Sequence, residues 1–273
     1  MASTDRPVAI VTGASRGIGR GAALGLGEAG WSVYLTGRTA SDGDSERPGS
    51  LGATADEVTG LGSEGIPVPC DHRSDADTEA VFTRVLDERG HLDLLVNNAT
   101  AYSTDLGPRE GAFWEVPIEE WDLMHAVGLR SHYLASVFAA RAMIPASRGL
   151  IVNISSVGAI QYTGSVSYNV VKAGVDMLTL ASAEELRPFG VAVISLWPRL
   201  TKTAAALAHP ELFPNLDQAW SPQLVGRIIA ALAADPKILE RSGGPLDIGA
   251  AAHDYGVTDV DGRQPVPRST SPE

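Results

Sequence analysis

The chain begins with a short apolar strand, a glycine-rich turn and a helical pattern, and this order constrains its fold more than any other feature. In the run PVAIVTGASRGIGRGAALGLGEAG, residues Val8–Val11 form the strand, and Gly13, Gly17 and Gly19 lie in the turn. Glycines placed here let the backbone approach a pyrophosphate, whose charge is met by the amide groups at the helix N-terminus. The order therefore predicts dinucleotide binding, although the G-x-x-x-G-x-G spacing also permits a turn that binds no ligand.

Strands and helices alternate along the rest of the chain. We predict six clear strands and a weaker seventh, at Val8–Val11, Ser32–Thr36, Ile66–Pro69, Leu92–Val96, Leu150–Ile154, Val191–Leu196 and Pro245–Ile248. Helical patterns fill the intervals, at Gly17–Ala29, Gly52–Leu61, Asp75–Arg89, Glu119–Ile144, Ser165–Arg187 and Pro222–Ala234. Most of these strands are apolar throughout, which is typical of a parallel sheet that is covered on both faces.

These repeated units predict an α/β fold of one domain over residues 1–273. We expect a Rossmann fold with a doubly wound, mostly parallel seven-stranded sheet flanked by helices, because successive parallel strands need helical crossovers. Three segments are predicted to be irregular: Ala40–Ser50, Ala101–Pro117 and a polar tail from about Asp261 to Glu273.

Composition narrows the class of partner. The formal charge of −12 disfavours nucleic acid and anionic membranes, since both would repel the protein. No apolar stretch is long enough to span a bilayer, and the first ten residues lack the basic start and apolar core of a signal peptide. The single cysteine, Cys70, excludes an internal disulfide and is best interpreted as a buried residue at a strand end. We expect a cytoplasmic protein that acts on small molecules without a metal ion.

Polar side chains follow the predicted strands where each strand ends. Arg38 follows the second strand, Asp71 the third and Asn97 the fourth, while Ser155 and Ser156 follow the fifth. Ligands of such folds bind at the carboxyl ends of the strands. Each residue taken singly could belong to a turn or cap a helix, but their placement at one edge of one sheet predicts a single site there.

A tyrosine and a lysine, Tyr168 and Lys172, lie four residues apart in a predicted helix. At this spacing their side chains share one face of the helix. An ammonium group held there favours the phenolate, and so lowers the pKa of the tyrosine from ~10 toward the range useful for proton transfer at neutral pH. The same spacing also arises by chance, with a half-buried tyrosine beside a solvated lysine. The glycine turn at the start of the chain favours the chemical interpretation.

Five motifs together resemble the short-chain dehydrogenase/reductase family, and they occur in the order typical of that family. They are TGASRGIG (Thr12–Gly19), NNA (Asn97–Ala99), ISS (Ile154–Ser156), YNVVK (Tyr168–Lys172) and the pair Pro198 and Thr203. The similarity runs from about Val8 to Ala234. Within the family, three stretches most resemble dehydrogenase/reductase member 1 and its bacterial relatives: Gly111–Pro117, Gly128–Pro145 and Tyr255–Arg263. The resemblance implies an oxidoreductase that transfers hydride between a dinucleotide and a carbonyl or alcohol.

The resemblance assigns the catalytic chemistry to a serine, a tyrosine and a lysine. Tyr168 would donate a proton in carbonyl reduction or accept one in alcohol oxidation, and Lys172 would lower its pKa and hold the nicotinamide ribose. The serine that binds the substrate oxygen normally lies thirteen residues before the tyrosine, which gives Ser155. Alignment on the strand end gives Ser156 instead. We predict Ser156, because strand register decides which side chain faces the site, whereas loops absorb deletions.

The resemblance also implies which residues bind the cofactor. The pyrophosphate and adenosine would lie against Thr12, Gly13, Ser15, Arg16, Ile18 and Gly19. Asp71 would meet the adenine, Asn97 the adenosine ribose and Thr203 the nicotinamide carboxamide, and Tyr168 and Lys172 would also contact the cofactor.

The residues after the second strand favour NADP over NAD. In NAD-binding folds an acidic residue at this point binds the free ribose 2′-hydroxyl, but here the position is Gly37. Arg38 follows it, and Arg16 in the glycine turn can approach the same place. Two guanidinium groups without a carboxylate suit a 2′-phosphate. In the alternative interpretation, Arg38 is a solvated loop residue.

Two positions depart from the pattern of the family. Gly128 replaces an asparagine that supports a proton-relay water near the lysine, so the relay is either rebuilt or absent. Arg199 replaces a glycine that lets the backbone pass close to the nicotinamide. Its guanidinium could pair with a cofactor phosphate or with an acidic substrate.

The substrate and the assembly are less constrained by the sequence. The segments Ala101–Pro117 and Thr203–Gln218 are predicted to form the substrate walls, with a possible apolar lining from Phe113, Trp114, Leu207, Leu212 and Phe213. In the alternative, these side chains pack against the body of the protein. The resemblance implies a homo-oligomer, either a dimer or a tetramer. A non-catalytic dinucleotide-binding sensor or structural subunit is the alternative function, but such a protein would have no need of the serine, tyrosine and lysine trio.

Overall fold

The computed structural model describes residues 6–102, 111–213 and 215–266, and its seven strands form one sheet in the order β3-β2-β1-β4-β5-β6-β7. Every neighbouring pair of strands is parallel. The strands are β1 (Val8–Thr12), β2 (Ser32–Gly37), β3 (Glu64–Pro69), β4 (Leu94–Asn97), β5 (Gly149–Ile154), β6 (Val191–Trp197) and β7 (Pro245–Asp247). The predicted seven-stranded Rossmann fold is confirmed, with a sheet that is parallel throughout.

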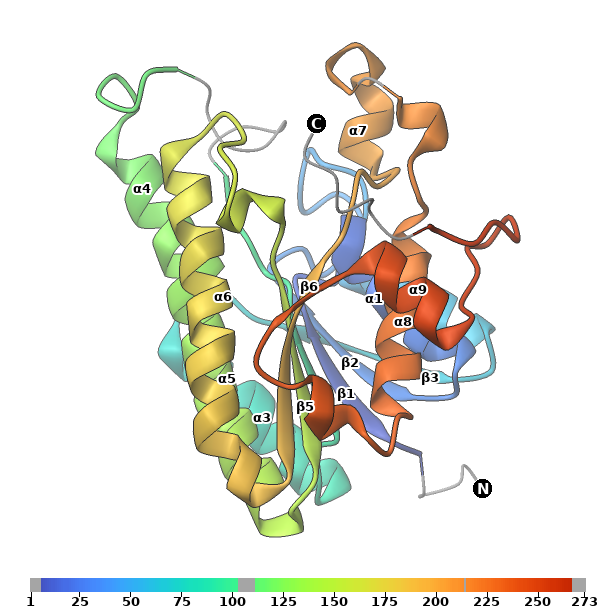
Figure 1. Cartoon of the computed structure of the whole chain (residues 1–273). Helices are drawn as coiled ribbons and strands as arrows, with labels where there is room; N and C mark the ends of the chain where they lie inside the picture. The colour runs from blue at the N-terminus through green and yellow to red at the C-terminus, as the bar shows by residue number, and fades with distance from the viewer. Residues whose placement is uncertain (1–5, 103–110, 214, 267–273) are drawn as a thin grey trace.

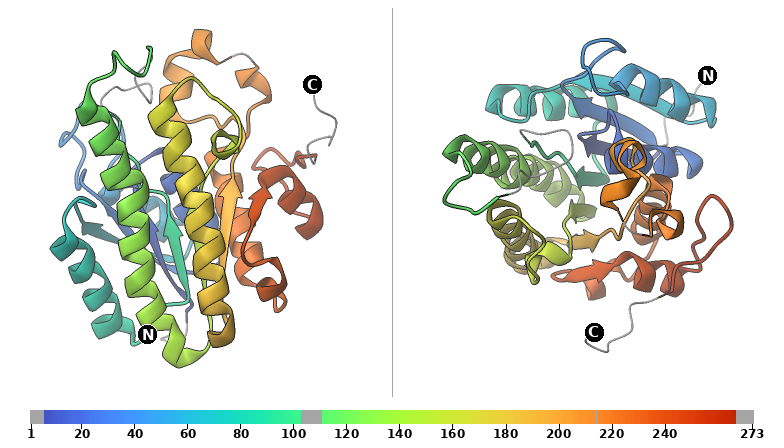
Figure 2. Two further views of the ribbon diagram at one scale, coloured as in Figure 1. Left: turned by 60° about the vertical axis from the view of Figure 1, so that its left-hand side comes forward. Right: turned by 90° about the horizontal axis from the view of Figure 1, so that it is seen from above.

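Helices cover both faces of the sheet (Figure 1). One layer contains α1 (Gly17–Glu28), α2 (Leu51–Gly60), α8 (Pro222–Ala233) and α9 (Ile248–Tyr255). The opposite layer contains α3 (Asp75–Arg89), α4 (Ile118–His125), α5 (Ser131–Met143) and α6 (Val166–Leu186). In the left view of Figure 2, α3, α5 and α6 lie side by side in front of the sheet. The short helix α7 (Ala204–Ala208) follows β6 beyond the edge of the sheet.

Strand β1 shows how the sequence produces two cores. All five of its residues are buried, and successive side chains point to opposite faces of the sheet. Ala9 and Val11 pack in the core beneath α1, α2, α8 and α9. Val8 and Ile10 pack in the second core, beneath α3, α5 and α6. Because both faces are covered, ligands can reach the sheet only at its edges and strand ends.

Three helical features differ from the sequence prediction. The predicted helix Glu119–Ile144 is interrupted by a π-helical turn, η1 (Ala126–Arg130). The short helices α7 and α9 were not predicted. The weak strand predicted at Pro245–Ile248 ends at Asp247, because the Asp247 carboxylate accepts hydrogen bonds from the next backbone amides and so begins α9.

The C-terminal segment has neither helix nor strand between residues 257 and 266, and the rest of the predicted tail lies outside the described residues. In the part of the chain that the structure describes, no helix has the length and apolar character needed to cross a membrane. The same residues contain no cluster of three or more His, Cys, Asp or Glu side chains that could hold a metal ion. Cys70 directly follows β3 and is buried, and burial raises the pKa of its thiol to about 11.

Candidate active site

The glycine turn after β1 packs closely against the end of β4. Gly13 has a φ of +68°, a backbone conformation that glycine adopts without strain. A Cβ at this position would lie 2.9 Å from Ala99 Cα, and a Cβ on Gly19 would lie 2.2 Å from the Gly13 carbonyl oxygen. Both positions therefore require glycine, and the turn presents bare backbone.

Helix α1 begins directly after this turn without a side-chain cap. Its N-cap residue, Arg16, makes no capping hydrogen bond, and the first turn carries no acidic residue. By contrast, serine hydroxyls cap four other helices, α2, α3, α6 and α8. Ser15 is buried at the turn, and Ile18 packs partly against the core. Uncapped amide groups at a helix start attract anions, so the glycine turn and α1 fit the pyrophosphate of a dinucleotide.

The two asparagines after β4 have different surroundings. Asn97 is fully buried, and its amide nitrogen donates to Asn153 Oδ1 at 2.9 Å and to Ser136 Oγ at 3.0 Å. The side chain of Asn97 points into the core, so the predicted contact with an adenosine ribose would have to come from its backbone and stays a prediction. Asn98, which the sequence analysis missed, donates from Nδ2 to the carbonyl oxygens of Thr12 and Gly13. The alternation of side chains at a strand end could have shown that only one of the two faces the turn.

The glycine turn is also hydrogen-bonded to the segment that follows β2. Arg16 Nη2 donates to Thr39 Oγ1 at 2.9 Å and to the Gly49 carbonyl oxygen at 3.0 Å. Its guanidinium thus lies beside the end of β2, where Gly37 is followed by the exposed Arg38. Thr39 was not singled out in the sequence, because nothing in its pattern distinguishes it from other loop threonines.

Asp71 lies at the end of β3, at the predicted edge of the sheet. Its carboxylate pairs with Arg73 through Nε at 3.1 Å and Nη2 at 2.6 Å. These hydrogen bonds lower the pKa of Asp71 to about 2, and the nearby charge of Arg38 acts in the same direction. The carboxylate is therefore ionised and neutralised locally by arginines, which limits its repulsion of an anionic ligand.

The tyrosine, the second serine and the lysine meet between β5 and α6. The Tyr168 hydroxyl donates to Ser156 Oγ at 3.0 Å, and the Gly158 amide donates to the same oxygen at 3.0 Å. Ser155 points the other way: it is buried, and its hydroxyl donates to the Lys172 carbonyl oxygen at 3.3 Å. Of the two candidate serines, only Ser156 is hydrogen-bonded to the tyrosine.

The electrostatics of this trio differ from the sequence prediction. Burial raises the pKa of Tyr168, and the hydrogen bond to Ser156 opposes that effect only in part. Lys172 Nζ donates to the Ile154 carbonyl oxygen at 2.9 Å and lies 5.6 Å from the centre of the tyrosine ring. Burial lowers the pKa of Lys172 to about 8. Lys172 is not among the groups that shift the pKa of Tyr168 in this structure, and the lowering of that pKa by the lysine stays a prediction.

Asp176, one helical turn beyond Lys172, was missed in the sequence analysis. Its carboxylate accepts hydrogen bonds from the Ser195 hydroxyl and from Trp197 Nε1, the latter at 3.1 Å. The negative charge of Asp176 raises the pKa of Lys172 and so opposes the effect of burial. Its spacing of four residues from Lys172 was a usable signal.

The two departures from the family pattern have separate structural settings. Gly128 is buried in η1, where a Cβ would lie 3.0 Å from Val171 Cγ1, so an asparagine would require its neighbours to move. Arg199 forms an ion pair with Asp247, with 2.6 Å between Nη2 and Oδ1. That contact differs from both partners considered for Arg199 in the sequence analysis. Thr203 begins α7 and lies beside the glycine turn.

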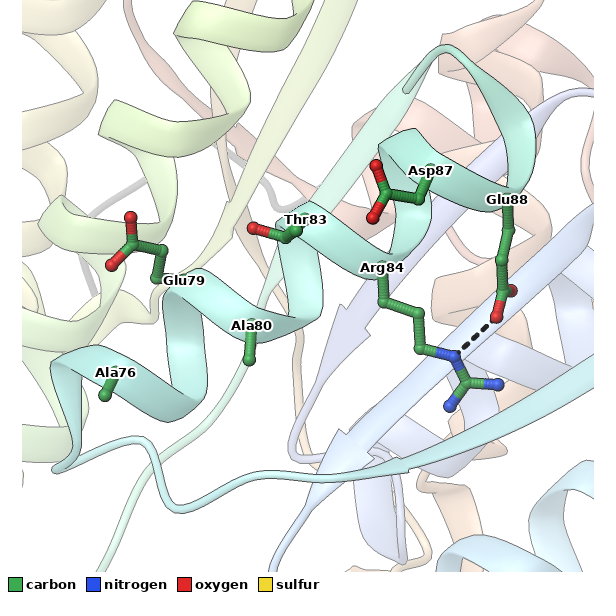
Figure 3. A pocket seen from close by; sticks show the side chains of 7 residues that line it. All are labelled: Ala76, Glu79, Ala80, Thr83, Arg84, Asp87 and Glu88. Carbon is green, nitrogen blue, oxygen red and sulfur yellow. Dashed lines mark hydrogen bonds and ion pairs between the residues drawn. The ribbon is translucent and has the colours of Figure 1, made fainter.

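A separate open depression of about 540 Å³ lies on the outer face of α3 (Figure 3). It is lined by side chains of that helix, including Arg84 and Glu88, which form an ion pair at 2.7 Å. None of the predicted site residues lines it. We therefore place the candidate active site at the carboxyl edge of the sheet.

Comparison with known proteins identifies the family of the chain. The sequence matches the short chain dehydrogenase family over residues 7–211. It is 44% identical over 270 residues to dehydrogenase/reductase SDR family member 1 of Mus musculus, and the alignment covers 94% of this chain and 84% of that protein. The predicted similarity to this member of the family is confirmed.

Two solved structures extend the comparison. A metagenomic short-chain oxidoreductase in complex with NADP aligns with a TM-score of 0.71 and 32% identity, over 89% of this chain and 97% of its own. A 3-oxoacyl-[acyl-carrier protein] reductase from Brucella melitensis in complex with NAD aligns with a TM-score of 0.78 and 27% identity, over 90% and 98%. The family match covers well over half of the sequence, and the chain belongs to the short-chain dehydrogenase/reductase family of NAD(P)-binding oxidoreductases.

Proposed function

We propose that the protein is an NADP(H)-dependent oxidoreductase that interconverts a carbonyl compound and a secondary alcohol. The observation that carries this proposal is the hydrogen bond of 3.0 Å between the Tyr168 hydroxyl and Ser156 Oγ, with the buried amino group of Lys172 on the next turn of α6. These three groups lie at the same edge of the sheet as the glycine turn. Tyr168 acts as the general acid or base, and Ser156 orients the substrate oxygen.

The hydrogen bonds around Ser156 define what its hydroxyl can do. Its oxygen already accepts from the Tyr168 hydroxyl and from the Gly158 amide. Its own proton is then available for the oxygen of a bound carbonyl group. When a carbonyl group binds, the single proton of Tyr168 would turn from Ser156 to the substrate oxygen, so that Tyr168 and Ser156 both donate to it. Donors placed in advance stabilise the charge that develops on that oxygen. The bound dinucleotide would supply or accept the hydride.

The raised pKa of Tyr168 bears on the form in which the tyrosine enters the reaction. Because burial disfavours the phenolate, the tyrosine is protonated at neutral pH and is ready to donate. Reduction of a carbonyl needs this form, whereas oxidation of an alcohol needs the deprotonated form. We propose that Tyr168 starts carbonyl reduction in the protonated form, with Lys172 stabilising the negative charge that forms on the tyrosine oxygen.

The proposal of NADP rather than NAD rests on charge at the end of β2. The Arg16 guanidinium is held beside the end of β2 by its hydrogen bonds to Thr39 and Gly49, and the neighbouring Arg38 is exposed. No carboxylate follows Gly37 at the position that would bind a 2′-hydroxyl. Arginine side chains form charge-assisted hydrogen bonds to phosphate. We propose that Arg16 and Arg38 bind the 2′-phosphate, with Gly13, Ser15, Ile18 and Gly19 around the pyrophosphate.

The proposed substrate is an apolar carbonyl compound. Large exposed side chains follow β4, β5 and β6, the strands that surround the trio, and they are Phe113, Trp114, Ile160, Tyr162, Leu207 and Leu212. Trp114 and Ile160 are 74% and 77% exposed, so these side chains do not pack against the body of the protein. Residues 103–110 and 214 of the two predicted walls lie outside the described residues.

A steady-state assay tests the proposed function. Purified protein is mixed with NADPH and a panel of aromatic and long-chain ketones and aldehydes, and the absorbance of NADPH is followed. We expect oxidation of NADPH with apolar carbonyl compounds and a slower rate with NADH. Tight binding of NADPH without turnover on any member of a broad panel would favour a dinucleotide sensor instead.

A further inference from the structure

Arg199 and Asp247 form a two-pronged ion pair where the chain leaves β6. The distances are 2.6 Å between Nη2 and Oδ1 and 3.1 Å between Nε and Oδ2. The two side chains are only 21% and 20% exposed. Paired hydrogen bonds of this kind fix the orientation of both groups. Removal of either partner would leave a largely buried charge without a counter-ion.

The carboxylate in this pair is itself held in place by the fold. Asp247 is the last residue of β7 and lies opposite Trp197 of β6. It also accepts hydrogen bonds from the amides of Gly249 and Ala250, at 2.9 and 3.2 Å. A Cβ on Gly249 would lie 2.5 Å from Arg199 Nη2, so the guanidinium rests against bare backbone. The ion pair between Arg199 and Asp247 has space for the arginine because residue 249 is a glycine.

The exit segment, residues Arg199–Thr203, leads from this anchor to the glycine turn. The Thr201 hydroxyl donates to the Arg199 carbonyl oxygen at 2.8 Å, within the segment. At its far end Thr203 caps α7, and its Cγ2 would lie 3.8 Å from a Cβ on Gly17. The middle of the segment is paired with Trp220, where the Lys202 amide donates to the Trp220 carbonyl oxygen at 2.8 Å. The ion pair of Arg199 is therefore one of two attachments that decide where Thr203 lies.

We propose that Arg199 is a positioning residue that, through Asp247, holds the exit segment so that Thr203 meets the nicotinamide end of the dinucleotide. This inference rests on the function proposed above. Without the ion pair the segment keeps only its backbone pairing with Trp220. The apparent affinity then falls by the fraction of time that the segment is correctly placed. The adenosine end is held by other elements, so its binding is independent of Arg199.

Calorimetric titration with two ligands tests this role. NADPH reports on the whole site, whereas adenosine 2′,5′-bisphosphate carries the 2′-phosphate but no nicotinamide. We expect Arg199→Ala to weaken NADPH about tenfold, as for a segment correctly placed a tenth of the time, and to leave the bisphosphate unchanged. Asp247→Asn keeps the cap of α9 but removes the charge, and should act like Arg199→Ala. The double variant should be no weaker than either single one, because both remove the same interaction.

Arg199→Lys keeps the charge and should restore part of the NADPH affinity. If Arg199→Ala does not fold, the same titrations are made with Arg199→Lys and Asp247→Asn. Two results would overturn the role of Arg199 and leave the proposed function intact, provided that the wild type binds both ligands. In the first, Arg199→Ala lowers the affinity for NADPH and for the bisphosphate equally; in the second, it changes neither affinity. A wild type that binds neither ligand would instead refute the proposed function, and this inference with it.

Discussion

The two halves of the candidate site use different groups of the protein, backbone in one and side chains in the other. The half around β1 and α1 consists of backbone: Gly13 and Gly19 exclude side chains, and the start of α1 is uncapped. The half around β5 and α6 consists of side chains: Ser165 caps α6, and Ser156, Tyr168 and Lys172 meet one turn further on. The first half is suited to hold an anion, and the second to move a proton.

This difference teaches that binding and chemistry should be separable in this protein. Backbone amides cannot be removed by a side-chain substitution, so the loss of the Tyr168 hydroxyl alone should spare most of the affinity for the cofactor. Changes at the end of β2 should alter cofactor choice without affecting proton transfer. Each prediction below tests one side of this division.

The largest effect is expected from Tyr168→Phe. The ring remains but the proton donor is lost, and removal of a general acid typically lowers turnover ~10²–10⁴-fold. Steady-state kinetics on an established substrate measure it. Tyr133→Phe is the control, since Tyr133 is exposed on α5 and has no part in the candidate site. Near wild-type turnover in Tyr168→Phe would exclude it as the acid.

The next effect distinguishes the two serines. Ser156→Ala removes a donor to the substrate oxygen, and such losses commonly lower turnover ~10²–10³-fold. Ser155→Ala should instead lower the midpoint of thermal unfolding, because it removes a buried hydrogen bond to the Lys172 carbonyl oxygen worth ~1 kcal/mol. If the variant at Ser155 loses more activity than the one at Ser156, the alignment on the strand end is wrong.

A smaller effect is expected at the end of β2. Gly37→Asp adds a carboxylate that can bind a 2′-hydroxyl and that repels a 2′-phosphate. The new Cβ would lie 3.5 Å from Leu51 Cδ2, an ordinary contact, so the fold should tolerate it. We expect the ratio of NADPH to NADH affinity to fall roughly tenfold to a hundredfold, with Gly37→Asn as the uncharged control. An unchanged ratio would remove the basis for the choice of NADP.

The smallest effect is a shift in pH dependence. Lys172 has a pKa of about 8, so its charge, and reductase activity with it, is retained below that pH and lost as the pH rises through it. Asp176 raises this pKa, so Asp176→Asn should move the alkaline limb of the rate profile to lower pH. The control is Asp87→Asn, on the outer face of α3. A shift to higher pH would mean that Asp176 does not act on Lys172.

Much of this architecture could be predicted from the sequence. All seven strands were predicted. The five inner strands are apolar runs because they are buried on both faces, whereas the edge strands β3 and β7 are more exposed and were predicted with shifted bounds. The short helix α9 was missed because its start depends on the capping carboxylate of Asp247 and not on apolar periodicity. The π-helical turn at Gly128 lies where that helix closely approaches α6, and local sequence does not encode this approach.

The site was predicted less completely than the fold. Motif spacing placed Tyr168 beside Lys172, but spacing does not report burial, and burial decides the direction of the pKa shift of Tyr168. Similarly, the side chain of Asn97 was expected at the edge of the sheet, whereas its neighbours in the core bind it. The partner of Arg199 lies 48 residues away in the sequence, and only the folded chain brings the two together.

The affinity of Tyr168→Phe for NADPH tests the division between the two halves most directly. Isothermal titration calorimetry would give the dissociation constants of the wild type and of the variant under the same conditions. If backbone holds the cofactor and α6 performs the chemistry, the two constants should agree within about twofold, a difference below ~0.5 kcal/mol. A variant whose NADPH binding is weakened as much as its turnover would contradict this account.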